Sequence, residues 1–391
     1  MKSYISHLEC TVTGQTYPID QPLGTSPASG KVLFPRYDLT KLRQTVDRKI
    51  FQTRPSNMWK YYELMPVQNP NNVITLGEGD TPLIHADNLA RKLGLKNIYV
   101  KDEGVNPTGS FKARGLSAAV SKAKELNQMR LTMPTAGNAG SAMAAYAAKA
   151  GMEAHIFMPK DAPDSNKIEC AALGSTLHLI DGLIGDAGRI SQEKAKLEGL
   201  FDLSTLREPY RVEGKKTMGL ELAEQLGWKT PDVIIYPTGG GTGIIGIWKA
   251  FEELRELGWI DSPQPKFVSI QAEGCQPLVR AFKAGHTTAL PHENASTLAS
   301  GLRVPGVFAD YLILDIIRQT GGTALSVSDR EMLDAMNELA SAEGIFAAPE
   351  GAATLVGLKK LIGQDFFQGD ETIILLNTGS GLKYLDVLDP V

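Results

Sequence analysis

The sequence predicts an α/β protein: two open, twisted, mainly parallel sheets flanked by helices, with a small domain inserted in a large one. From about residue 97, short apolar runs alternate with helical segments, which is typical of parallel strands joined by right-handed crossovers. Glycine contributes 39 of 391 residues and gathers in the turns between these segments. The hydrophobic fraction of 42% is enough for a large core, and the length suits more than one domain.

The first 70 residues lack this rhythm, because seven prolines interrupt them. One helix is expected over 38–50, capped by Asp38 or Thr40. We expect residues 1–70 to be an N-terminal arm that packs on the body.

The elements that follow are read from apolar runs bounded by glycine and proline. Strands are expected at 97–103, 131–135, 153–159, 176–181, 232–238, 266–274 and 372–378. Helices are expected at 111–126, 137–151, 162–174, 184–198, 215–227, 243–257, 276–284, 308–320, 328–343 and 350–363. The strand–helix units after the first of these helices predict a small substrate-binding domain at 117–205. The large cofactor-binding domain would then comprise 71–116 and 206–391.

Charge and cysteine content exclude several classes of protein. Lysine plus arginine is 40 and aspartate plus glutamate is 44, so no basic excess predicts a nucleic-acid partner. Cys10, Cys170 and Cys275 are far apart, which predicts neither a disulfide framework nor a metal site and favours the cytoplasm. No uninterrupted apolar run of about 18 residues predicts a membrane span.

Four glycine-rich loops occupy the carboxyl ends of predicted strands, where sheets of this kind bind ligands. The first, NPTGSFKARG at 106–115, places Lys112 at a helix start beside the hydroxyl of Ser110. A lysine there is usually a solvated surface residue. A helix N-terminus and partial burial lower its pKa, however, and allow it to form a Schiff base.

The other three loops suit anions and polar ring atoms. PTAGNAGS at 134–141 places Asn138 at a helix start, either as a simple cap or beside N–H groups that hold a carboxylate. PTGGGTGIIG at 237–246 offers N–H groups to a phosphate, although it also matches the dinucleotide pattern G-x-G-x-x-G with Glu273 further on. NTGSG at 377–381 places Thr378 among glycines, as in a plain turn or in a ligand loop.

Together these loops resemble the tryptophan-synthase-like family of pyridoxal phosphate enzymes, known as fold type II. Within that family the chain is most similar to the threonine synthases over about residues 75–385. The similar segments are GEGDTPL (77–83), KDEGVNPTGSFK (101–112), PTAGNAGSAMAAYAAKAG (134–151), YRVEGKKTMGLELAEQLGW (210–228) and TGSGLK (378–383).

The resemblance implies pyridoxal 5'-phosphate as cofactor, with Lys112 as the Schiff-base lysine. It implies that the cofactor phosphate is held by Gly239, Gly240, Gly241, Thr242 and Gly243, the 3-hydroxyl by Asn138 and the pyridine nitrogen by Thr378. The loop Thr135, Ala136, Gly137 would bind the substrate carboxylate, and Lys101, Arg211 and the hydroxyl of Ser110 its phosphate. The implied reaction converts O-phospho-L-homoserine and water to L-threonine and phosphate, in a homodimer.

Three departures from the threonine synthase pattern leave alternatives open. Ala113 follows the lysine, where aspartate is usual, and Glu208 precedes a proline, where asparagine is usual. The loop GGGTG is closer to that of threonine and serine dehydratases. A dehydratase, or a β-replacement enzyme such as cysteate synthase, is therefore the main alternative. A nicotinamide dehydrogenase and a non-catalytic relative are more remote.

Overall fold

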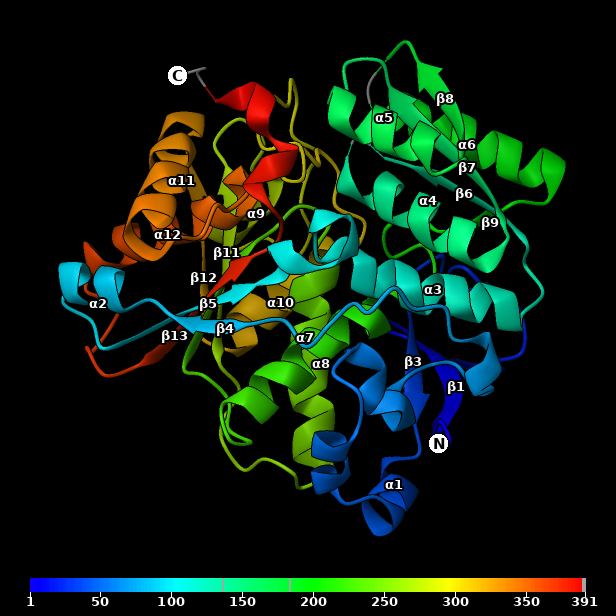
Figure 1. Ribbon diagram of the computed structural model, residues 1–391, viewed down its shortest axis with the longest axis horizontal. Coiled ribbons are helices and arrows are strands. Elements are labelled where there is room, and N and C mark those ends of the chain that lie inside the picture. Colours follow the sequence, from blue (N-terminus) through cyan, green and yellow to red (C-terminus); the bar gives the residue numbers. More distant parts are fainter. Residues whose placement is uncertain (136, 183, 389–391) are drawn as a thin grey trace. The chain divides into compact units, whose positions relative to one another are not determined.

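The structure is a computed structural model that describes residues 1–135, 137–182 and 184–388 (Figure 1). Contacts between Cα atoms divide the chain into two compact units. Unit 1 comprises Met1–Asp80, Lys112–Met218 and Glu253–Trp259, and unit 2 comprises Thr81–Phe111, Gly219–Glu252 and Ile260–Val391.

Unit 2 contains a six-stranded sheet in the order β12-β11-β10-β13-β5-β4. Its strands are β4 (Leu83–His85), β5 (Asn97–Asp102), β10 (Val233–Pro237), β11 (Lys266–Ala272), β12 (Thr323–Val327) and β13 (Thr372–Asn377). All neighbours run parallel except β4, which pairs antiparallel with β5. Every residue of β10 is buried, which explains its unbroken apolar sequence.

The helices of unit 2 pack around this sheet and bury apolar residues. They are α2 (Asp87–Leu93), α8 (Thr242–Glu256), α9 (Pro277–Lys283), α10 (Asp310–Gln319), α11 (Asp329–Glu343) and α12 (Pro349–Ile362). Helix α11 begins at a capping box in which Ser328 and Glu331 exchange hydrogen bonds. One hydrophobic core joins strands β5, β10, β11 and β13 to helices α2, α11 and α12.

Unit 1 contains a parallel four-stranded sheet in the order β8-β7-β6-β9. Its strands are β6 (Arg130–Pro134), β7 (Glu153–Pro159), β8 (Thr176–Ile180) and β9 (Phe201–Asp202). The helices are α3 (Lys112–Glu125), α4 (Asn138–Ala150), α5 (Asp164–Ala172) and α6 (Ile184–Glu198), and α7 (Arg211–Gln225) begins in this unit. Both α3 and α4 are rich in alanine, so that their buried faces pack closely against each other.

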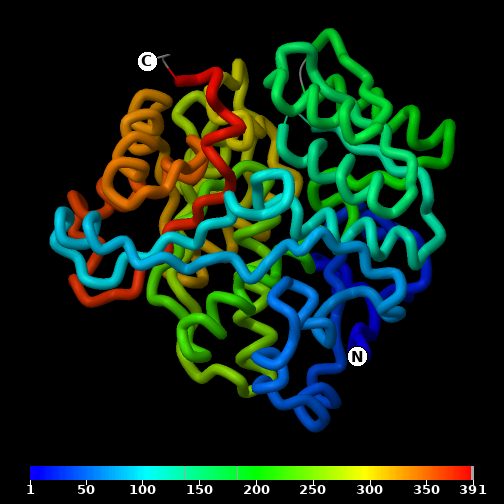
Figure 2. Tube along the Cα trace, in the orientation of Figure 1, coloured from blue at the N-terminus to red at the C-terminus, as the bar shows by residue number. Residues whose placement is uncertain are grey.

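The N-terminal segment differs from the irregular arm that the sequence predicts. It forms an antiparallel sheet, β2-β1-β3, from Ile5–Cys10, Thr16–Tyr17 and Leu33–Tyr37. Helix α1 (Leu39–Thr45) is capped by Asp38 as expected but is shorter, and 3-10 turns follow at Arg48–Thr53, Met58–Leu64 and Pro70–Asn72. In unit 1, Leu8 and Leu33 pack in the same core as α3 and α4. The course of the N-terminal segment is the blue part of the trace in Figure 2.

The seven predicted strands are confirmed within a few residues. The sequence analysis missed β4, β12, α2 and the short strand β9. Further 3-10 turns occupy Glu103–Val105, Pro107–Gly109, Gly381–Lys383 and Leu385–Val387. In the described part of the chain, no helix has the length and apolar character needed to cross a membrane.

Candidate active site

The glycine-rich loop between β10 and α8 in unit 2, called here the glycine cradle, is packed too closely for side chains at three of its glycines. A Cβ atom on Gly239 would lie 2.2 Å from the carbonyl oxygen of Gly301, and one on Gly243 would lie 1.8 Å from the hydroxyl of Tyr236. Gly241 has φ +81° and would meet Ile313 at 2.1 Å. The glycines therefore let the main chain of this loop pass close to its neighbours at the start of a 15-residue helix, and a glycine-rich main chain at a helix N-terminus is a geometry that binds phosphate.

The segment that precedes Lys112 is hydrogen-bonded to the loop after β13, also within unit 2. Phe111 N donates to the carbonyl of Thr378 at 3.0 Å, and Ser380 N donates to the carbonyl of Gly109 at 2.9 Å. Thr378 is only 6% exposed. Two of the predicted ligand loops are thus held in register with each other.

Four buried hydroxyls in unit 2 have no hydrogen-bond partner among the described residues, those of Thr108, Ser110, Tyr236 and Ser269, and the first three lie in or next to the predicted ligand loops. Ser110 is fully buried, and burial raises the pKa of Tyr236, so its hydroxyl stays protonated. Buried polar groups are normally paired, so unpaired hydroxyls beside the segment leading to Lys112 and beside the glycine loop indicate a place for a polar ligand.

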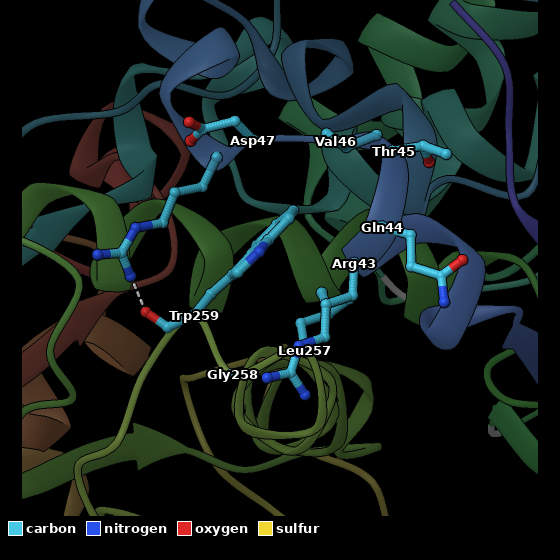
Figure 3. Close-up of a pocket in the computed structure, with 9 residues that line it drawn as sticks. Arg43, Gln44, Thr45, Val46, Asp47, Leu257, Gly258 and Trp259 are labelled. Atoms are coloured by element: carbon cyan, nitrogen blue, oxygen red, sulfur yellow. Dashed lines mark hydrogen bonds between the residues drawn. The ribbon is translucent and has the colours of Figure 1, made fainter.

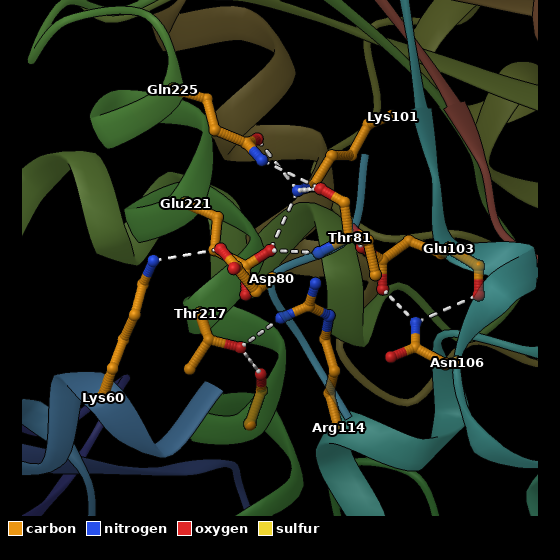
Figure 4. Close-up of polar contacts among 11 residues, drawn as sticks. Lys60, Asp80, Thr81, Lys101, Glu103, Asn106, Arg114, Thr217, Glu221 and Gln225 are labelled. Atoms are coloured by element: carbon orange, nitrogen blue, oxygen red, sulfur yellow. Dashed lines mark hydrogen bonds and ion pairs between the residues drawn. The ribbon is translucent and has the colours of Figure 1, made fainter. Parts of the chain in front are cut away.

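Lys101, expected as a phosphate ligand, is buried in an ion pair (Figure 4). Its ammonium group donates to Glu221 at 2.8 Å, to the carbonyl of Thr81 at 2.7 Å and to Gln225 at 3.0 Å. These bonds use all three of its donors, and both side chains of the pair are 0% exposed. A phosphate-ligand role would require these buried bonds to break, which the arrangement disfavours.

Glu103 is a buried carboxylate that the sequence analysis did not single out. It accepts hydrogen bonds from the hydroxyl of Thr81 at 2.6 Å and from the amide of Asn106 at 2.8 Å, and these three residues are drawn in Figure 4. The Thr81 contact ties the 3-10 turns after β5 to the segment before β4, and the Asn106 contact holds the two turns together. Glu103 therefore fixes the course of the chain toward Lys112.

In unit 1, Lys112 begins α3 and Arg211 begins α7, and the first turns of these helices meet at glycines. A Cβ atom on Gly115 would lie 3.1 Å from the carbonyl oxygen of Arg211, and one on Gly214 would lie 2.1 Å from that of Arg114. The buried Arg114 also donates to the hydroxyl of Thr217 on α7 at 2.9 Å (Figure 4). The structure thus brings together the helix starts that carry Lys112 and Arg211.

The turn between β6 and α4 carries the residues expected to bind a carboxylate. Thr135 is 7% exposed, and its hydroxyl accepts a hydrogen bond from Gly137 N at 3.1 Å. A Cβ atom on Gly140 would lie 2.7 Å from the methyl group of Thr135, so the turn is closely packed. Asn138 begins the helix, half-buried, whereas Ala136 lies outside the described residues.

Glu208, the departure from the threonine synthase pattern, accepts hydrogen bonds at the start of α7. Its carboxylate accepts from Tyr210 N at 2.6 Å and from Arg211 N at 3.0 Å. The guanidinium group of Arg211 donates to the carbonyl of Leu203 at 2.7 Å and is 1% exposed. Burial, with a smaller contribution from Asp202, raises the pKa of Glu208, while Arg211 and the two main-chain N–H groups lower it, and the net pKa is about 7.

A separate open pocket of about 570 Å³ lies in unit 1 (Figure 3). Its lining residues are Arg43, Gln44, Thr45, Val46, Asp47, Arg48, Leu257, Gly258 and Trp259. None of the predicted site residues lines it. Among the described residues, no three His, Cys, Asp or Glu side chains are grouped to bind a metal ion.

Comparison with protein families extends these observations. The profile described as "Pyridoxal-phosphate dependent enzyme" matches residues 74–379. The threonine synthase of Methanosarcina acetivorans is 38% identical over 378 residues, which is 96% of this chain and 92% of that protein. The threonine synthase of Methanocaldococcus jannaschii is 36% identical, with the same coverage of both chains.

Solved structures share the fold. Maize serine racemase aligns with a TM-score of 0.65 at 23% identity, covering 77% of this chain and 88% of that one. A fungal L-serine ammonia-lyase from Rhizomucor miehei aligns with a TM-score of 0.64 at 25% identity, covering 78% and 96%.

The described residues fit the cofactor of this family. The glycine cradle before α8 suits its phosphate, and the unpaired buried hydroxyls of Ser110 and Tyr236 offer polar contacts. With a family profile matching most of the chain and relatives matching nearly all of it, the chain belongs to the pyridoxal-phosphate-dependent enzymes and uses pyridoxal 5'-phosphate as its cofactor.

Proposed function

We propose that this enzyme is a threonine synthase, which converts O-phospho-L-homoserine and water to L-threonine and phosphate. The observation that carries the proposal is the extent of the match to threonine synthases. The two archaeal relatives cover 96% of the chain, including much of the N-terminal segment that the family profile leaves out. A shared cofactor fold alone would not account for similarity in that segment.

The cofactor contacts that we propose are those that the resemblance implies. Lys112 would bind the cofactor covalently, Asn138 would contact its 3-hydroxyl, and Thr378 would contact its pyridine nitrogen. The phosphate is held by the loop Gly239, Gly240, Gly241, Thr242 and Gly243. A threonine hydroxyl, unlike a carboxylate, does not keep the ring nitrogen protonated, which favours elimination and replacement over transamination. When bound, pyridoxal phosphate supplies the electron sink for breaking bonds at the amino-acid carbons.

The protein's own groups carry out the remaining work. The Lys112 amine would take the proton from Cα of the substrate and move protons at Cβ, where water adds. Thr135, Ala136 and Gly137 hold the substrate carboxylate. Arg211 and Ser110 hold the phosphate group that leaves from Cγ. The buried ion pair of Lys101 with Glu221 supports a structural role for Lys101 in place of the phosphate contact expected from the sequence.

A dehydratase or a β-replacement activity is the second candidate. The GGGTG loop favours it, and so does the acidic Glu208 beside Arg211, since a carboxylate repels a phosphorylated substrate. Unphosphorylated serine or threonine would then be the preferred substrate. The nicotinamide dehydrogenase considered from the sequence is set aside by the family match.

Phosphate release and amino-acid product, measured with O-phospho-L-homoserine, serine and threonine in parallel, test this assignment. We expect equal amounts of phosphate and threonine from the phosphorylated substrate and little ammonia from the other two. Preferential release of ammonia from serine or threonine would establish the dehydratase instead.

The organisation of the whole enzyme is also a proposal. We assign residues 1–70 to an N-terminal arm, 117–205 to the substrate-binding domain and the remainder to the cofactor-binding domain. We further propose a homodimer in the cytoplasm that has a small amino-acid substrate as its partner and binds no nucleic acid. Sedimentation of the purified holoenzyme tests the dimer.

A further inference from the structure

Arg211 is a buried cation that makes no direct ion pair with the described residues, although the nearby carboxylates of Glu208 and Asp202 oppose the lowering of its pKa by burial. Its side chain is 1% exposed, and its Nε has no hydrogen-bond partner among the described residues. Its guanidinium group contacts the carbonyl of Leu203, the sulfur of Met133 at 3.4 Å and the hydroxyl of Thr205 at 3.5 Å. A buried charge is costly unless it is paired. Arg211 therefore keeps one buried donor, Nε, that an anion could accept from, while Glu208 and Asp202 supply nearby negative charge in the free protein.

The start of α7 is the second part of this anion site. The helix is 15 residues long, so its first N–H groups carry the positive end of a sizeable dipole. At present Glu208 accepts from two of the main-chain N–H groups there, those of Tyr210 and Arg211. The carboxylate of Glu208 thus occupies donors of the kind that helix starts offer to phosphate.

A phosphate on Arg211 would lie close to Glu208, because the carboxylate already contacts the main chain of the same residue. A phosphate monoester carries nearly two negative charges at neutral pH. We propose that Glu208 is neutral whenever the substrate phosphate is bound, so that phosphate binding takes up one proton. This inference rests on the proposed function for the identity of the anion.

The charges around Glu208 place its protonation in a pH range where it can be measured. Burial, followed by Asp202, raises the pKa of Glu208, and Arg211 and the two N–H groups lower it, with the balance at about 7. Burial also raises the pKa of Asp202, which Arg207 opposes. Burial and Glu208 raise the pKa of Tyr210, so this phenol stays neutral. Arg211 remains a cation although burial lowers its pKa.

The sign of the effect follows from this balance. Below about pH 7 the free protein already holds the proton on Glu208, and phosphate binds without further uptake. Above it, each bound phosphate requires one proton, so the affinity falls about tenfold per pH unit. From about pH 6 to about pH 8.5, a Glu208 pKa of about 7 predicts a loss of about 30-fold.

Titration calorimetry with sulfate tests the coupling on the holoenzyme, since sulfate is a dianion that does not itself titrate in this range. Measurements near pH 8 in two buffers of different ionisation enthalpy give the number of protons bound per sulfate. We expect close to one proton for the wild type and close to none for Glu208→Gln and Glu208→Asn. The affinity of these variants should change less than about threefold between pH 6 and pH 8.5.

Two further variants separate this role from a general loss of charge. Asp202→Asn removes the neighbouring carboxylate and should retain the proton uptake. Glu331→Gln makes the same chemical change at the start of α11 and should leave uptake and turnover unchanged. Equal uptake in wild type and Glu208→Gln, loss of uptake in Asp202→Asn alone, or absence of saturable sulfate binding overturns the proposal. Proton-linked sulfate binding without turnover of O-phospho-L-homoserine would contradict the proposed function and leave the anion site standing.

Discussion

A guanidinium group binds phosphate through two parallel N–H donors, which a lysine ammonium group does not reproduce. We therefore expect Arg211→Ala to lower kcat/KM for O-phospho-L-homoserine about tenfold or more. One charge-assisted hydrogen bond contributes about 1.5–3 kcal/mol, and 1.4 kcal/mol is about a factor of ten. Arg211→Lys should recover only part of the loss, and the cofactor absorption spectrum should not change. Wild-type kinetics in Arg211→Ala would remove this residue from the phosphate site.

Glu208 also makes stability depend on pH in an unusual direction. Its pKa is raised from 4.5 to about 7, so the folded protein binds this proton more tightly than the unfolded chain. Stability is then lost as the pH rises from about 4.5 to about 7, by a few kcal/mol. Urea unfolding of Glu208→Gln and wild type gives the difference between their free energies of unfolding. This difference should favour the variant more at pH 8 than at pH 5.

Glu331 provides a control of opposite sign for that measurement. Its pKa is lowered from 4.5 by the Ser328 and Lys360 hydrogen bonds, which outweigh its modest burial. A lowered acid pKa contributes stability that is present at neutral pH and lost in acid. Glu331→Gln should therefore lose more stability at pH 8 than at low pH. The same trend in both variants would contradict the assigned environment of Glu208.

Lys112 can be identified directly by chemistry. Borohydride reduction of the yellow holoenzyme, followed by peptide mapping, should place the cofactor on Lys112, and Lys112→Ala should yield no labelled peptide. We expect this because Lys112 is the first residue of α3, which meets the start of the helix that carries Arg211. A label on another lysine would refute the assignment.

At the level of elements, α3 and α7 can cross closely only because glycine, which has no side chain, stands at the crossing. A Cβ atom on Gly214 would overlap the carbonyl of Arg114 at 2.1 Å, so Gly214→Ala must push the helices apart. Overpacking of this kind costs about 1–3 kcal/mol. The shift should also lower turnover, because Lys112 lies one turn from the crossing. Thermal unfolding and kcat/KM measure the two effects.

Gly185→Ala on α6 is the matched control, since nothing lies within 4 Å of the added methyl group. Replacing an exposed helical glycine with alanine should stabilise the protein by about 0.5–1 kcal/mol. Opposite changes in the two variants would show that close contact, not helix propensity, decides the cost. A stabilised Gly214→Ala would contradict the crossing.

The strands and helices of the repeating part could be predicted because each carries a local pattern. The strand predicted at 97–103 is β5, and that predicted at 372–378 is β13, although their pairing spans some 275 residues. The β2-β1-β3 sheet could not be predicted in the same way. Its strands are short, and Pro35 stands inside β3, where it signals a break unless the partner strand is known.

Across the whole molecule, the sequence indicates residue types more readily than their contacts. Spacing singled out Gly241, Gly243 and Gly246 and the resemblance added Gly239, and the structure leaves no room for a side chain at positions 239, 241 and 243. Lys101 was expected at a phosphate, because nothing local indicates that Glu221 lies beside it. The carboxylate of Glu208 was recognised as a departure, yet its position over the first N–H groups of α7 follows only from three-dimensional structure.

The N-terminal segment is integral to unit 1, which leads to a final prediction. Trp59 is 6% exposed and packs in a cluster that includes Ala118 of α3. Its indole N–H donates to Ser117 at 2.9 Å and to Glu78 at 3.1 Å. Because truncation leaves a large cavity and removes a donor from buried acceptors, Trp59→Ala should destabilise the fold by about 3–5 kcal/mol. Leu197→Ala, at a side chain 86% exposed, should change it by less than about 0.5 kcal/mol. Equal unfolding free energies for the two variants would show that the segment before residue 70 is dispensable.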